Sequence, residues 1–336
     1  MVVDGGVALV TVGDAADPGL RGRHGAIGHG PMVVVGSGRG PADGSAAGGR
    51  GRARIGLDPA PETLVWASGR AATLVAMEDR TPEVGAPDPA SFYTGLVAEL
   101  YRHLRSADPD PEPYARFVEV SGEPALELGC GDGDPLLDLR ARGLDVEGLD
   151  ASLDMVERCR RAAGDRGLDV VVHHASFESM DLGRRYRSIY LAGPTFNLRP
   201  DDETARRALE RIRAHLEPGG SALVPLFVPE PVPPGDIGSS RQAVGPDGAT
   251  MRVTVVSADR DVAERRQTTV LRYELVRDDE AQVVERPWLL HWFEQDRFAR
   301  LAADAGLSVH AVLAPDGTAA APDADTFVYW LGAPSR

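Results

Sequence analysis

The chain has 336 residues, enough for one large or two modest domains with a buried core. Its formal net charge of −15 at pH 7 argues against a nucleic-acid-binding protein, because binding a phosphate backbone needs clustered cations. The two cysteines, Cys130 and Cys159, lack the spacing of a zinc site or a disulfide framework, so we predict no metal site and expect a reducing cytoplasm. No apolar run approaches the roughly 20 residues that span a bilayer, so no membrane segment is predicted.

Residues 1–85 differ in composition from the rest of the chain. They are rich in glycine, as in GSGRGPADGSAAGGRGRARIG, and hold few aromatic residues, so a disordered, low-complexity extension is predicted there. Met77 is the expected natural start. The segment Pro31 to Gly40 and the later Asp58 superficially match a nucleotide-binding fingerprint, but the glycines and proline between them cannot form the required helix. We therefore place no site in this extension and begin the folded domain at residue 86.

From Ser91 onward, helical and strand-like segments alternate. Apolar residues recur at helical spacing in Phe92, Leu96, Leu100 and Leu104. In chain order, the pattern predicts helices at 91–104, 114–120, 134–143, 152–163, 201–216 and 294–306, and strands at 125–128, 144–150, 168–174, 186–192, 221–228, 307–314 and 325–332. After residue 228 the period changes to two, which predicts antiparallel strands at 251–259, 266–276 and 282–293.

This order of elements predicts a Rossmann-like α/β fold for residues 86–336. The main sheet is expected to be doubly wound and mostly parallel, with about seven strands of which the last is antiparallel. Residues 229–292 are expected to form an inserted antiparallel sheet that covers the substrate site.

A glycine-rich segment follows the first predicted strand of this sheet. It runs Glu127-Leu128-Gly129-Cys130-Gly131-Asp132-Gly133, and its glycines let the backbone turn sharply and approach a ligand closely. Asp134 and Pro135 are predicted as the N-cap and first residue of the next helix. Asp150 ends the neighbouring strand, where an acid accepts hydrogen bonds from ribose hydroxyls. The ligand is therefore predicted to be a nucleoside.

The spacing of the glycines distinguishes this loop from the dinucleotide-binding fingerprint G-x-G-x-x-G. The third glycine comes one residue early, and the Glu127 carboxylate would repel a diphosphate. The pattern E-x-G-x-G-x-G with a distal acid resembles motif I of the class I S-adenosylmethionine-dependent methyltransferases. The resemblance extends from about Ser91 to the C-terminus and includes the strand order and the LEPGG turn at 216–220. It implies S-adenosylmethionine as the cofactor.

Carried over residue by residue, the resemblance implies a cofactor site along the strand ends. Glu127 would stiffen the loop or meet the amino group, and Asp150 would bind the ribose. Ser176 and Phe177 stand where the family commonly has an acidic and then an apolar residue beside the adenine, so a serine here departs from the pattern. The other implied cofactor-binding residues are Gly129, Cys130, Gly131, Ala151, Met155 and Ala192.

The inserted strands resemble the cover of small-molecule N- and O-methyltransferases, such as the glycine and amino-sugar enzymes. His291 is the candidate general base and Tyr101 a second candidate catalytic residue. The methyl acceptor is expected to contact Tyr93, Phe196, Asn197, Arg241, Trp288 and Trp292. For Arg241 the functional interpretation is contact with an anionic acceptor, and the alternative is a solvated surface arginine.

These assignments predict methyl transfer to a nitrogen or oxygen atom of a small metabolite by a monomer or homodimer. Plainer roles stay open: Asp150 as a helix-terminal acid, Trp288 and Trp292 as core residues, and Arg241 as a solvated surface residue. A nicotinamide-dependent oxidoreductase and a non-catalytic S-adenosylmethionine-binding protein are the alternative functions.

Overall fold

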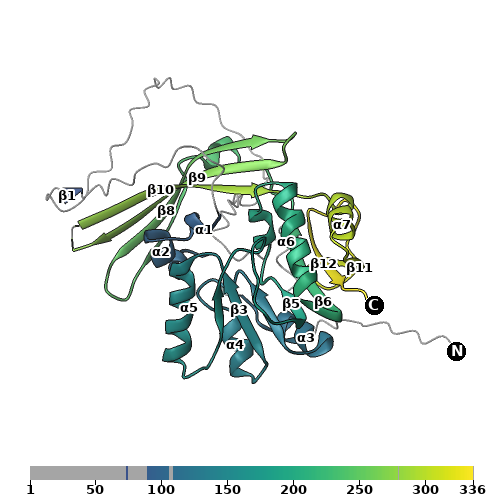
Figure 1. The fold of residues 1–336 in the computed structure, drawn as a ribbon. Helices are drawn as coiled ribbons and strands as arrows, with labels where there is room; N and C mark the ends of the chain where they lie inside the picture. Colours follow the sequence, from purple (N-terminus) through teal and green to yellow (C-terminus); the bar gives the residue numbers. More distant parts are fainter. Residues whose placement is uncertain (1–72, 75–88, 106–108, 279, 336) are drawn as a thin grey trace, which may run out of the picture.

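The computed structural model describes residues 73–74, 89–105, 109–278 and 280–335 (Figure 1). The predicted disorder of residues 1–72 and 75–85 and the expected start at Met77 lie outside these described residues. Thr73–Leu74 forms a two-residue strand, β1, inside the segment predicted to be an extension. No helix in the described part of the chain is long and apolar enough to cross a membrane.

The main sheet has seven strands in the order β11-β12-β6-β5-β2-β3-β4. Its strands are β2 (Ala125–Leu128), β3 (Val146–Asp150), β4 (Val172–His174), β5 (Tyr186–Tyr190), β6 (Leu216–Phe227), β11 (Ser308–Leu313) and β12 (Thr326–Gly332). Strands β2 to β6 are parallel, and β12 is antiparallel to both of its neighbours. This confirms the predicted fold class, and the strand order reverses between β2 and β5, where α/β sheets bind ligands.

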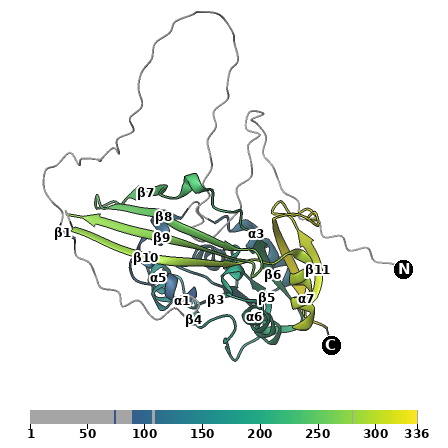
Figure 2. The same cartoon turned by 90° about the horizontal axis from the view of Figure 1, so that it is seen from above.

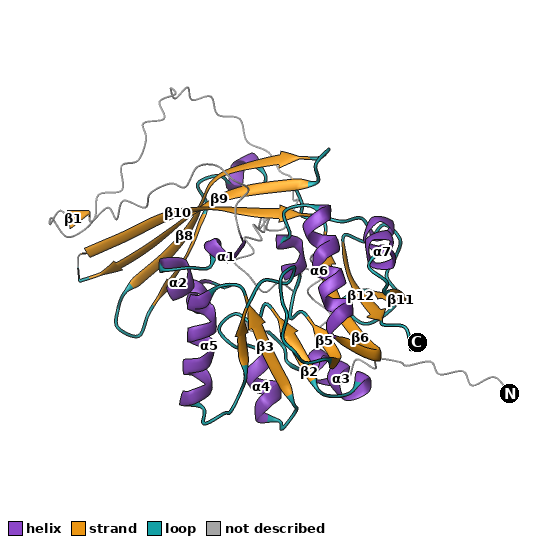
Figure 3. Ribbon diagram, viewed as in Figure 1, coloured by secondary structure: helices purple, strands orange, loops and turns teal. Residues whose placement is uncertain are grey.

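Helices cover both faces of this sheet (Figure 3). Helices α6 (Asp202–His215) and α7 (Gln295–Asp304) pack on one face. The other face carries α3 (Glu112–Ser121), α4 (Leu136–Ala141) and α5 (Leu153–Asp165). In α6 the buried residues Ala205, Ala208, Leu209 and Ile212 recur at helical spacing, and the Asp201 carboxylate caps the helix by accepting from Thr204 N at 2.7 Å.

A second sheet lies across the end of the parallel strands (Figures 1 and 2). This cover sheet has the order β1-β10-β9-β8-β7, with β7 (Ser240–Val244), β8 (Thr250–Asp261), β9 (Arg266–Arg277) and β10 (Glu280–His291) antiparallel and β1 parallel to β10. Helices α1 (Pro89–Phe92) and α2 (Leu96–Leu104) pack beneath it. The inserted sheet was predicted, but strand β7 was not.

Boundaries differ from the predictions by more than two residues at two strands of the main sheet. Strand β4 contains only the last three of the seven residues predicted, because it lies at the sheet edge, where Val171 is 51% exposed. Strand β6 begins at Leu216 and includes the LEPGG segment, through a shift in its register with β5.

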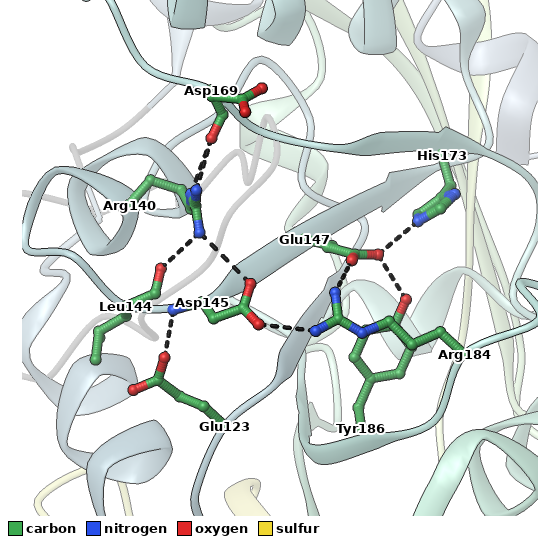
Figure 4. Close-up of polar contacts among 9 residues, drawn as sticks. All are labelled: Glu123, Arg140, Leu144, Asp145, Glu147, Asp169, His173, Arg184 and Tyr186. Carbon is green, nitrogen blue, oxygen red and sulfur yellow. Dashed lines mark hydrogen bonds and ion pairs between the residues drawn. The ribbon is translucent and has the colours of Figure 1, made fainter.

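A polar network ties β3 to β4 and β5 (Figure 4). The Glu147 carboxylate accepts hydrogen bonds from the Tyr186 hydroxyl at 2.7 Å and from Arg184, and it lies 2.8 Å from His173 Nε2. Burial by itself would raise the pKa of Glu147, but these hydrogen bonds together lower it. Arg184 also bonds Asp145 at 2.7 Å. His173 is thus part of a structural network in the sheet.

Candidate active site

An open cavity lies at the carboxyl ends of β2 and β3, with about 620 Å³ of empty space that includes open solvent. Eight of the ten residues predicted for the cofactor line it: Gly129, Cys130, Gly131, Asp150, Ala151, Met155, Phe177 and Ala192. Tyr93 and Tyr101, predicted for the acceptor side and catalysis, line it as well.

The glycine loop needs residues without side chains at two positions. Gly129 has φ 72° and Gly131 has φ 53°, a region that L-residues rarely adopt. A Cβ atom on Gly129 would also lie 3.3 Å from both the Phe177 ring and Thr195 Oγ1. The backbone amides of Gly129 and Cys130 donate to the Leu149 carbonyl at 2.7 and 3.0 Å, which fixes the loop against β3.

Asp150 joins the glycine loop to the start of α5. Its Oδ2 accepts from Gly131 N at 2.9 Å and its Oδ1 accepts from Ser152 N at 2.8 Å. Burial raises the pKa of Asp150, while these two hydrogen bonds oppose the shift. Each oxygen keeps one further acceptor position at the cavity wall. Two neighbouring acceptor positions fit the hydroxyl pair of a ribose, whose O–H groups donate, so the residues present fit an adenosyl cofactor.

The apolar part of the cavity is formed by Met155, Phe177 and Leu198. The Arg199 guanidinium lies 4.5 Å from the Phe177 ring centroid and forms an ion pair with Glu178 at 2.7 Å. Ser176 does not line the cavity, and its hydroxyl lies 2.7 Å from the Ser179 hydroxyl. The serine that stands in place of the family's acidic residue is therefore not part of the cavity wall.

Glu127 is buried behind the loop and does not line the cavity. Its carboxylate accepts a hydrogen bond from the Tyr190 hydroxyl at 2.8 Å, and the Tyr190 ring stacks on Tyr114 with a centroid distance of 5.5 Å. Burial raises the pKa of Glu127 to about 8. Of the two roles predicted for Glu127, these contacts fit stiffening of the strand end.

Two arginines, one in α2 and one at its C-terminal end, hold this helix against the glycine loop. Arg102 Nε lies 2.9 Å from the Asp132 carboxylate and Arg102 Nη1 lies 3.0 Å from Asp134. Arg105 Nη2 lies 2.8 Å from Asp134. The predicted N-cap role of Asp134 is wrong, because its carboxylate binds these arginines and α4 begins at Leu136 without a side-chain cap. Sequence spacing could not show this pairing across about 30 residues.

Tyr93 and Tyr101 form the cavity wall beneath the cover sheet. The Tyr93 carbonyl accepts from the Ser152 hydroxyl at 2.6 Å, and Gly95 N donates to Asp154 at 2.6 Å, so the turn between α1 and α2 is fixed to the start of α5. The two tyrosine rings meet edge to face with centroids 5.8 Å apart. Burial raises the pKa of both hydroxyls well above the ordinary value, so both stay protonated at neutral pH.

The structure places His291 away from the cavity lining. Its Nε2 lies 3.3 Å from Arg265 Nη2 and 3.6 Å from Asp202, and burial lowers its pKa to about 4. The Trp292 side chain is also buried, under the Arg260 guanidinium at 4.1 Å. Neither side chain lines the cavity.

Phe196 and Asn197 likewise serve packing. Phe196 lies among Phe293 and Phe298 in the core. The Asn197 amide donates to the carbonyls of Phe227 and His291, both at 2.9 Å, and so joins β6 to the end of β10.

Four lining residues were not predicted: Asp134, Thr195, Leu198 and Arg199. Thr195–Leu198 forms a 3₁₀ turn, η1, with three residues per turn, so Thr195 and Leu198 share the cavity side while Phe196 and Asn197 face the core. The sequence pointed to this segment through Phe196 and Asn197, but only the helical phase of η1 shows which side chains reach the cavity.

Comparisons with known proteins agree with this architecture. Residues 125–220 match a family model described as a methyltransferase domain. The chain is 27% identical over 234 residues to dTDP-3-amino-3,6-dideoxy-alpha-D-glucopyranose N,N-dimethyltransferase of Streptomyces fradiae, a match covering 66% of this chain and 87% of that protein.

Two solved structures show the same fold. The CcbJ methyltransferase from Streptomyces caelestis gives a TM-score of 0.57 at 21% identity, covering 71% of this chain and 96% of that one. SAM-bound CalS10, an amino pentose methyltransferase from Micromonospora echinaspora, gives 0.53 at 21% identity, covering 71% and 97%.

The doubly wound sheet, the glycine loop and these matches define a class I S-adenosylmethionine-dependent methyltransferase. The protein is an enzyme of this class, and S-adenosylmethionine is its cofactor.

Proposed function

We propose that this enzyme transfers the methyl group of S-adenosylmethionine to the amine nitrogen of a small-molecule acceptor of the amino-sugar class. The similarity to an amino-sugar N,N-dimethyltransferase supports the proposal, although that substrate belongs to the relative. These comparisons set aside the nicotinamide oxidoreductase considered from the sequence, because they are to methyltransferases.

One observation favours nitrogen over oxygen: the described residues lining the cavity offer no side chain suited to be a general base. Asp134 is held by two arginines, Asp150 accepts two backbone hydrogen bonds, and the hydroxyls of the tyrosine wall stay protonated. A hydroxyl acceptor gains from a base that removes its proton, whereas an uncharged amine attacks with its own lone pair.

The residues of this chain contribute alignment rather than activation. The cofactor supplies a methyl group already activated on a sulfonium, so holding the nucleophile in line carries the rate. The glycine loop and Asp150 would fix the nucleoside end. The hydroxyls of Tyr93 and Tyr101 would accept hydrogen bonds from the acceptor amine and orient its lone pair.

The first test is cofactor binding. We expect Asp150→Ala to weaken S-adenosylhomocysteine binding roughly 100-fold, because two hydrogen bonds to a charged group are lost at about 1.5 kcal/mol each. Asp150→Asn, which keeps one acceptor, should lose roughly tenfold. Asp181→Asn is the control, since this side chain is 88% exposed. Isothermal calorimetry measures all of these.

The second test is methyl transfer to paired amine and alcohol acceptors, followed by mass spectrometry. Methylated amines support the proposal. Exclusive methylation of hydroxyls would contradict the assignment to nitrogen, and binding of the nucleoside without transfer to any acceptor would favour a non-catalytic role.

A further inference from the structure

The inner face of the cover sheet carries polar side chains that the proposed cofactor site does not use. Arg241 on β7 pairs with Val253 on β8, and Val253 pairs with Tyr273 on β9, so Arg241 and Tyr273 stand in one row across three strands. Trp288 on β10 lies on the same face, since it stands four residues from Val284, which pairs with Tyr273, and packs against the cluster beneath the sheet. Three chain segments thus converge above α1 and α2.

Polar atoms of this row are buried without hydrogen-bond partners among the described residues. They are Arg241 Nε and Nη2 and Tyr273 Oη; on the same face, four residues along β10 from the row, Trp288 Nε1 also has no partner among the described residues. Tyr273 is only 1% exposed, and the Trp288 indole N–H stands near the Tyr93 hydroxyl without a well-formed hydrogen bond. Buried polar groups are nearly always paired in folded proteins, so unpaired ones gathered in one place indicate a ligand.

Charge is the second part of the argument. No described carboxylate forms an ion pair with Arg241, whereas the outward-facing Arg272 pairs with Glu285 at 2.6 Å and Arg277 pairs with Asp247 at 2.9 Å. Arginine stays protonated in proteins, and burial lowers the pKa of Arg241, which marks an unfavourable environment for its charge. A half-buried cation of this kind is stabilised by an anion.

The Phe92 ring connects the row to the wall of the cavity. The Phe92 ring meets Tyr273 at a centroid distance of 6.2 Å and Tyr93 at 4.9 Å, and Tyr93 lines the cavity. None of the described residues lining the cavity belongs to the cover sheet, so an acceptor whose amine lies against Tyr93 and Tyr101 would have to extend past Phe92 to reach Arg241.

We propose that Arg241 and the Tyr273 hydroxyl bind an anionic oxygen group, a carboxylate or a phosphate, carried by the methyl acceptor. The planar guanidinium donates two parallel hydrogen bonds to either group, and the tyrosine hydroxyl donates a third. The proposal rests on the proposed function, because the anion is part of the molecule that is methylated. It makes Arg241 and Tyr273 specificity-determining residues and places both outside the cofactor site.

The test uses the full chain saturated with S-adenosylhomocysteine and titrated at low ionic strength with inorganic pyrophosphate or with succinate. We expect one probe to bind, with at least tenfold weaker binding in Arg241→Gln and three- to tenfold weaker binding in Tyr273→Phe. Arg241→Lys should fall between Arg241→Gln and the wild type, because it keeps the charge but loses the second parallel donor. The probe that binds identifies the group as phosphate or carboxylate.

Controls separate this proposal from the proposed function. Arg272→Gln, an equal charge change on the outer face beside Tyr273, should leave probe binding unchanged. The affinity for S-adenosylhomocysteine should be the same in all variants, and an unchanged affinity shows that each variant is folded. If Arg241→Gln loses this affinity, the result with Tyr273→Phe tests the proposal instead. Absence of probe binding to the wild type, or equal binding by wild type and Arg241→Gln, would overturn the proposal and leave the cofactor assignment intact. If the wild type does not bind S-adenosylhomocysteine, the cofactor assignment itself is refuted.

Discussion

Glu127 and Asp150 are two acids on neighbouring strands whose surroundings give them different properties. Asp150 accepts two backbone hydrogen bonds at the cavity, which favour its charged form. Glu127 has one hydroxyl partner and complete burial, which raises its pKa to about 8. At neutral pH Glu127 is therefore mostly an uncharged acid.

The raised pKa predicts how stability changes with pH. The stability contributed by protonated Glu127 is fully present below its ordinary pKa of 4.5 and decreases as pH rises, until the group is ionised above about 8. The total loss is at most about 5 kcal/mol, since one pKa unit corresponds to about 1.4 kcal/mol. Glu127→Gln should remove this loss, so its stability relative to wild type should increase from pH 5 to pH 9.

Urea unfolding at several pH values measures this difference. Glu119→Gln, on the exposed side of α3, is the matched control and should show no trend. A constant difference between Glu127→Gln and wild type over the whole range would show that Glu127 is ionised throughout.

Sequence patterns identified Asp150 and Gly131 at this scale because both depend on local backbone geometry at the ends of strands. His291 could not be judged in the same way. An aromatic segment such as WLLHWF suits a substrate pocket and a core equally, and the contact of His291 with Phe293, at a centroid distance of 4.6 Å, belongs to the core.

At the scale of elements, the contact between α2 and the glycine loop depends on two arginines that differ in burial. The Arg105 side chain is 6% exposed and lies against Asp134, whereas Arg102 is 47% exposed. Ion pairs that are buried leave an uncompensated charge when one partner is removed, while exposed pairs contribute little.

We therefore expect Arg105→Ala to lower the free energy of unfolding by about 3 kcal/mol and Arg102→Ala by about 1 kcal/mol or less. Thermal and urea unfolding measure both. Arg105→Ala should also weaken S-adenosylhomocysteine binding, because Asp132 and Asp134 support the loop that holds Gly131. Equal effects of the two substitutions would show that burial does not govern this contact.

At the scale of the whole molecule, the cover sheet lies across the end of the main sheet where the cavity opens. The main sheet places the cofactor loop at the strand-order reversal, and the cover sheet adds the face that carries Arg241 and Tyr273. Among the described residues, strand β1 is the only element that comes before α1 in the chain. It joins the cover sheet by two residue pairs with β10.

A chain that begins at Met77 should therefore keep its fold and its affinity for S-adenosylhomocysteine, with a loss of stability of about 1 kcal/mol or less from the missing edge pairing. Thermal unfolding and calorimetry measure the two quantities. A chain that begins at Val97 is the comparison and should lose affinity, because it lacks Tyr93. Loss of binding in the Met77 form would refute the assignment of residues 1–76 as a dispensable extension.

The sequence by itself determined the doubly wound sheet, the inserted cover and the glycine loop with its distal acid. These follow from hydrophobic periodicity and from a spacing of about 20 residues within one βαβ unit, which local backbone geometry enforces. Only the tertiary structure decided that Asp134 binds arginines, that η1 turns Thr195 rather than Phe196 to the cavity, and that Arg241 and Tyr273 share a row. Those outcomes depend on helical phase and on register between strands distant in sequence, which no single segment encodes.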